Sequence, residues 1–97
     1  MMRPKTPDSN DEAEVTALKA LAFLAADPDR FSRFMDLSGL DLAAIRASAA
    51  EPAFLGGLLD HLLTDDSLLL IFAEEHGLRP GRIAELRRKL PGASIDF

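Results

Sequence analysis

The residues of this chain that could do acid, base or metal chemistry are few and lie far apart. The only two imidazoles, His61 and His76, fall on different predicted helices, and neither has a second ligand at His-x3-His or Glu-x2-His spacing. The paired acids Asp65-Asp66 are better explained as helix-capping residues, and no serine lies in a Gly-x-Ser-x-Gly elbow. We therefore expect no metal, no cofactor and no enzyme activity.

The strongest chemical signal is a cluster of basic residues on the last predicted helix. Its members are Arg79, Arg82, Arg87, Arg88 and Lys89. These five cations and the single acid Glu85 give residues 79–90 a charge of +4 (5 − 1), so the rest of the chain carries −9 out of a net −5. A basic helix on an otherwise acidic chain favours the binding of an acidic surface. The five cations are therefore the candidate residues for binding a protein partner or a second copy.

The same segment offers an alternative, a nucleic-acid-binding helix-turn-helix in residues 66–90. A small residue, a turn glycine and three apolar positions between Ala73 and Leu86 resemble the corner of that motif. However, the outward positions at the start of the second helix include Pro80, Gly81 and Ala84, which have no base-reading side chains. The net negative charge also argues against nucleic acid, so a protein partner is the preferred interpretation.

An internal similarity predicts the elements that position these residues. With an offset of 38, the chain matches itself at Asp27 and Asp65, Phe34 and Phe72, Gly39-Leu40 and Gly77-Leu78, and Ile45 and Ile83. Aspartate caps the start of a helix, and glycine ends one at a left-handed residue. The pattern predicts an all-α fold, a compact bundle of five to six short helices with an internal three-helix repeat and two helix-turn-helix-like corners.

The expected helices follow from caps, prolines and apolar periodicity. They run from near Asp11 to Asp27-Pro28, from Pro28 to about Leu37, from Leu42 to about Ala50, from Glu51-Pro52 to about Leu63, from Leu68 to His76, and from Pro80 to about Lys89. We expect the first helix to bury a stripe of five residues, namely Val15, Leu18, Leu21, Ala22 and Ala25. Five consecutive apolar residues predict that the fifth helix is central. Gly56-Gly57 inside the fourth helix indicates close approach of a neighbour or a kink.

Composition predicts one domain with short tails. The chain has 97 residues, of which 47% are hydrophobic and 28% charged, which suits a single helical domain over residues 11–90. We expect residues 1–10 to be a disordered tail, and residues 91–97 to be a C-terminal tail whose Ile95 and Phe97 fold back on the core. The longest apolar run is too short to span a bilayer, and no signal-peptide core follows the basic start. A cytoplasmic protein without membrane contact is expected.

Three segments together resemble a known family. They are Ala20 to Ala25 followed by Asp27-Pro28, Phe34 to Ile45, and Leu58 to Leu63 followed by Asp65. This set is similar to an uncharacterised family of small all-helical bacterial proteins, defined only as a domain of unknown function, over about residues 15–90. The resemblance implies a helical fold and a bacterial origin, and it brings no activity, cofactor or catalytic residue. We interpret the chain as a small non-enzymatic helical protein-interaction module, an adaptor or regulator.

Overall fold

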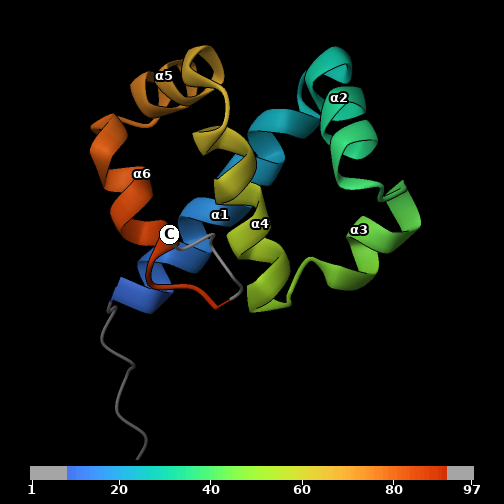
Figure 1. The fold of residues 1–97 in the computed structure, drawn as a ribbon, viewed down its shortest axis with the longest axis horizontal. Helices are drawn as coiled ribbons and strands as arrows, with labels where there is room; N and C mark the ends of the chain where they lie inside the picture. The colour runs from blue at the N-terminus through green and yellow to red at the C-terminus, as the bar shows by residue number, and fades with distance from the viewer. Residues whose placement is uncertain (1–8, 92–97) are drawn as a thin grey trace, which may run out of the picture.

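The computed structural model describes residues 9–91 and folds them into a bundle of six helices (Figure 1). The helices are α1 (Ser9–Ala25), α2 (Pro28–Ser38), α3 (Leu42–Ser48), α4 (Pro52–Leu63), α5 (Asp66–Glu75) and α6 (Pro80–Arg87). No strand interrupts this described part of the chain. The predicted all-α bundle of short helices is confirmed, and none of its helices is long and apolar enough to cross a membrane.

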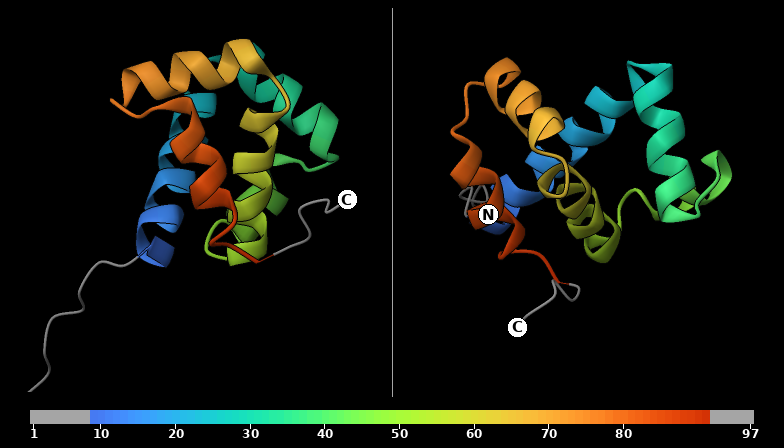
Figure 2. Two further views of the ribbon diagram at one scale, coloured as in Figure 1. Left: turned by 60° about the vertical axis from the view of Figure 1, so that its left-hand side comes forward. Right: turned by 45° about the horizontal axis from the view of Figure 1, so that its top comes forward.

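Helices α1 and α4 form the centre of the bundle. They pack against each other, and α6 packs against both of them. Figure 2 shows α1, α6 and α4 side by side beneath α5, which contacts α4 and α6. Helix α2 packs on α1, while α3 lies at the edge of the molecule, away from α5 and α6 (Figure 1). The two helices that follow each central helix are therefore placed differently, and the internal three-helix repeat stays a prediction.

Local capping chemistry sets the helix boundaries as the sequence predicts. The Asp27 carboxylate accepts hydrogen bonds from the first backbone N–H groups of α2, the Asp41 carboxylate from Ala44 N–H of α3 at 2.8 Å, and the Asp65 carboxylate from α5. Gly39 and Gly77 end α2 and α5 with φ angles of 75° and 66°, which glycine adopts without steric cost. Each corner is thus specified by residues within a few positions of it.

The buried face of α1 differs from the predicted one. Val15, Leu18, Ala22 and Ala25 are exposed and Leu21 is half-buried, whereas the core face is formed by Ala13, Thr16, Ala17, Ala20, Phe23 and Leu24. Three alanines on this face let α4 and α6 approach α1 closely, and larger side chains there would hold the helices apart. Phe23 and Leu24 then fill the end of the interface, where the Phe23 ring meets the edge of Phe72 at a centroid distance of 5.3 Å.

Helix α5 is not central, contrary to the prediction. Leu70 is 54% exposed and Ile71 is also exposed, because α5 covers one end of the bundle and buries only one side (Figure 2). The run of five apolar residues at the start of this helix therefore does not mean that other helices cover α5 on both sides. At the N-terminus, α1 begins at Ser9, two residues before Asp11, near which the sequence predicted its start. The rest of both predicted tails, with Ile95 and Phe97, lies outside the described residues.

We predict that charge at either corner isoleucine unfolds the bundle. Ile45 and Ile83 are both buried in the core, so Ile45→Asp and Ile83→Asp should each lower the free energy of unfolding by several kcal/mol by burying an unpaired charge. Thermal unfolding followed by helical circular dichroism measures this change. Leu70→Asp, at an exposed position, is the matched control and should melt close to the wild type. A wild-type melting temperature for either isoleucine variant would contradict the packing described.

Candidate interaction surface

The two histidines lie in separate packing environments. The His61 ring meets the edge of Phe34 at a centroid distance of 5.1 Å. Its burial lowers the imidazole pKa, with Asp65 opposing that shift and Arg33 adding to it. His76 packs on Phe72, and its Nδ1 lies 3.1 Å from the Phe72 carbonyl oxygen. Both rings are thus packed against phenylalanine side chains. No group of three His, Asp or Glu side chains within residues 9–91 is arranged to hold a metal ion.

Of the five candidate cations, Arg87 is turned into the protein. It is only 4% exposed. Its Nε donates a hydrogen bond to Asp60 Oδ1 at 2.7 Å, and its Nη1 donates to the backbone oxygens of Leu90 at 3.0 Å and Pro91 at 3.3 Å. The prediction that Arg87 faces a partner is therefore wrong. Its charge alone made it a candidate, but a carboxylate on α4 and two carbonyls after α6 satisfy its guanidinium inside the protein.

One glycine of the pair on α4, Gly56, leaves room for this buried guanidinium. A Cβ atom on Gly56 would lie 2.8 Å from Arg87 Nη1 and 2.9 Å from the Pro91 carbonyl oxygen. Gly56 is thus required by close approach, one of the two explanations that the sequence left open. Gly57, by contrast, faces open space, and a Cβ atom added there would meet no other atom within 4 Å. Of these two neighbouring glycines, only Gly56 is therefore required by packing.

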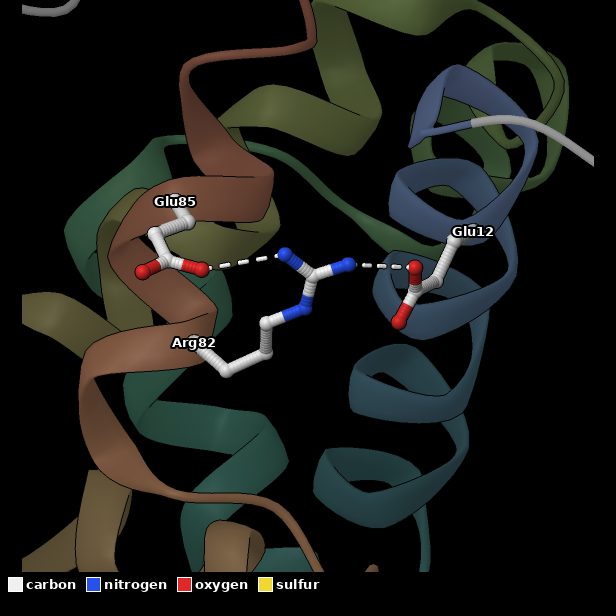
Figure 3. A network of polar contacts seen from close by, with 3 residues as sticks. All are labelled: Glu12, Arg82 and Glu85. Carbon is white, nitrogen blue, oxygen red and sulfur yellow. Dashed lines mark hydrogen bonds and ion pairs between the residues drawn. The ribbon is translucent and has the colours of Figure 1, made fainter.

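Arg82 links α6 to α1. Its guanidinium lies between two carboxylates, Glu12 of α1 and Glu85 of α6, and donates a hydrogen bond to each (Figure 3). The hydrogen bond from Arg82 lowers the pKa of Glu85. The Glu12 contact joins residues 70 positions apart, so no local pattern could have predicted it. Arg82 is half-buried and already paired, and it contributes less free positive charge than the sequence indicates.

Three of the candidate cations remain exposed without an ion pair in the described part of the chain: Arg79, Arg88 and Lys89. Arg79 lies at the start of α6, whereas Arg88 and Lys89 lie just after its end. Together with Arg82 and Glu85, Arg88 and Lys89 surround a shallow polar depression of about 390 Å³. We call these four residues, Arg82, Glu85, Arg88 and Lys89, the α6 basic face.

The structure also contains a groove that sequence reasoning missed. It lies between α2 and α4, has a volume of about 350 Å³, and is lined by Phe34, Leu37, Ser38, Gly57, Asp60, His61 and Thr64. Leu37 on its rim is 64% exposed. Because Gly57 has no side chain, the groove stays open at that position. A glycine inside a helix was the one sequence signal that could have indicated this groove.

The α5–α6 corner has the connection of a helix-turn-helix but lacks a reading face. Pro80, Gly81 and Glu85 are exposed where that motif would contact bases, and Ala84 is half-buried. Glu85 is already hydrogen-bonded to Arg82. None of these side chains can donate a bidentate pair to a base edge, so the geometry adds no support to nucleic-acid recognition.

We predict opposite effects of alanine at the two neighbouring glycines. Gly57→Ala should raise the free energy of unfolding by up to about 1 kcal/mol, because the methyl group meets nothing and alanine favours the helix. Gly56→Ala should lower it, because the new Cβ collides with Arg87 and the Pro91 carbonyl. Chemical denaturation of both variants measures the difference. Equal effects at the two positions would show that Gly56 does not make room for the guanidinium.

Comparison with known proteins gives a family but no function. A family model described as "Protein of unknown function (DUF3572)" matches residues 10–93. No curated protein and no solved structure matches the chain significantly. The match covers the six helices except for Ser9, the first residue of α1, and includes Gly56, Arg87 and the α6 basic face. The chain belongs to the DUF3572 family of proteins of unknown function.

Proposed function

We propose that this protein is a non-enzymatic, cytoplasmic helical interaction module of bacteria, an adaptor or regulator whose α6 basic face binds an acidic surface of a protein partner. One observation carries the proposal. Arg88 and Lys89 are exposed and have no ion pair within residues 9–91, although residues outside 79–90 carry a net charge of −9. Two adjacent unpaired cations on an acidic molecule are positioned to meet charges that another molecule supplies.

The arrangement of the face supports binding by charge complementarity. Arg82 is held by its hydrogen bonds to Glu12 and Glu85, while Arg88 and Lys89 line the same depression with no ion pair in the described part of the chain. Exposed charges of this kind contribute little to the stability of the monomer. They contribute mainly to the rate and specificity with which an acidic partner associates. We therefore expect binding that weakens as salt is added.

Duplex DNA is the other class of acidic ligand that such a face could attract, and it is the alternative outcome of the test. A DNA-binding helix-turn-helix places the start of its second helix in the major groove. Here Arg79 is the only free cation at the start of α6 among residues 9–91, and Pro80 and Gly81 follow it, whereas Arg88 and Lys89 lie beyond the opposite end. Contacts from Arg88 and Lys89 to phosphates alone would not read sequence. A protein partner is the better supported proposal.

We predict that reversing the charge of the two free cations of the α6 basic face removes partner binding and leaves the fold intact. The test compares the double variant Arg88→Glu/Lys89→Glu with the control Arg33→Glu/Arg46→Glu, which changes the net charge equally at two exposed residues of α2 and α3. Both should melt close to the wild type, since all four side chains are exposed. Partners captured from a lysate of the source organism by the wild type should bind the control, and should be lost with the α6 variant and in about 0.5 M salt.

Two results would contradict the proposal. Partners that bind both double variants equally would show that the α6 basic face is not the interface. A mobility shift of duplex DNA at physiological salt, abolished in the α6 variant and kept in the control, would instead establish nucleic-acid binding by the same face.

A further inference from the structure

Helix α1 carries a second apolar stripe that the bundle leaves uncovered. Val15, Leu18, Ala22 and Ala25 follow one another at spacings of three, four and three residues and are all exposed, Val15 by 50% and Leu18 by 46%. This spacing corresponds to the a and d positions of a heptad repeat. On a helix with about 100° per residue, the stripe lies opposite the buried alanines that pack on the other helices. Helix α1 therefore has one face for its own core and one apolar face free.

The side chains at the edges of this stripe carry opposite charges. Glu14 precedes Val15 and Lys19 follows Leu18, which places them at g and e positions of the same heptad register. Neither makes an ion pair in the described part of the chain. The two residues are five positions apart, the separation at which a g residue of one helix meets an e residue of its partner in a parallel two-stranded pair.

We propose that the α1 stripe binds the same stripe of a second copy, so that two α1 helices pair in parallel around a twofold axis. A β-branched residue at position a with leucine at position d, as in Val15 and Leu18, favours two strands. The alanines at the next a and d positions allow the second half of the helices to approach closely. Each Glu14 then pairs with Lys19 of the other copy, which gives two ion pairs per dimer.

The flanking charges also select the parallel orientation. In an antiparallel pair centred on the stripe, e positions face e positions, and the two copies of Lys19 would lie near each other without an acid. The buried alanine face of α1 points away from the stripe, so most of each bundle lies on the side of α1 away from the partner helix. The α5–α6 corner lies nearer, because His76 and Leu78 line a surface hollow together with Val15 and Lys19. Asp11, one turn before Val15, occupies the preceding d position and ends the apolar stripe.

The dimer should be weak and reversible. The seam covers only residues 15–25, about three helical turns, and half of its inward positions are alanine. This surface is on α1 and shares no residue with the α6 basic face, so the dimer and the binding of an acidic partner can be tested separately. A result that contradicts one of the two proposals does not contradict the other.

The dimer and its charge pairs can be tested by sedimentation equilibrium, which measures dimerisation, over protein concentrations up to about 1 mM. We predict a concentration-dependent dimer in the wild type. Leu18→Glu should weaken it at least tenfold, with unchanged circular dichroism because Leu18 is exposed. Glu14→Lys and Lys19→Glu should each weaken it, and the double variant Glu14→Lys/Lys19→Glu should restore it, because opposite charges again meet across the pair. A wild type that stays monomeric, or a Leu18→Glu variant that dimerises normally, would overturn the proposal.

The orientation has its own test, because the chain contains no cysteine. In a parallel pair residue 25 of one helix meets residue 25 of the other, so Ala25→Cys should form a disulfide-linked dimer under mild oxidation. Ala53→Cys, at an exposed alanine of α4, is the matched control and should form much less. An antiparallel pair would separate the two copies of residue 25 by about 15 Å. Equal cross-linking of the two variants, or a charge swap that fails to restore the dimer, would overturn the parallel arrangement proposed.

Discussion

The arrangement of this bundle depends on one buried cation. A guanidinium in an apolar core costs several kcal/mol unless carboxylate and carbonyl oxygens satisfy its donors. Asp60 on α4 and two carbonyls after α6 do so for Arg87, and Gly56 leaves the space that the group occupies. These contacts join α4, the end of α6 and the chain beyond it. Helix α6 is therefore held against α4 by directional hydrogen bonds in addition to apolar packing.

The same constraint determines which charges remain for interactions. With Arg87 inside and Arg82 held between Glu12 and Glu85, only part of the basic last helix faces solvent as free charge. The core likewise determines which apolar residues of α1 remain exposed. Its inner face is formed largely by alanines, so the larger Val15 and Leu18 lie outside. The surfaces that we propose for partner binding and for dimerisation thus consist largely of charged and apolar residues that are not buried in the core.

The sequence predicted the parts of this fold that local chemistry determines. Capping aspartates, left-handed glycines and prolines act within a few residues, so helix boundaries and corners could be predicted closely. The inward face of α1 could not, because two stripes with the same helical period compete and only packing against α4 and α6 decides between them. The pairings of Arg87 with Asp60 and of Arg82 with Glu12 span 27 and 70 residues. Both pairings depend on the tertiary structure. The predicted surface therefore wrongly included Arg87, which is buried.

The most direct test of the buried cation is the exchange rate of the arginine Nε–H protons with water, measured by nuclear magnetic resonance. Exposed guanidinium protons exchange rapidly, whereas a buried and hydrogen-bonded one exchanges only when the structure opens. We predict one strongly protected Nε–H signal, which belongs to Arg87 and disappears in Arg87→Lys. If the Arg87 proton instead exchanges as fast as that of the exposed Arg33, the guanidinium is not held in the core and the central claim is wrong.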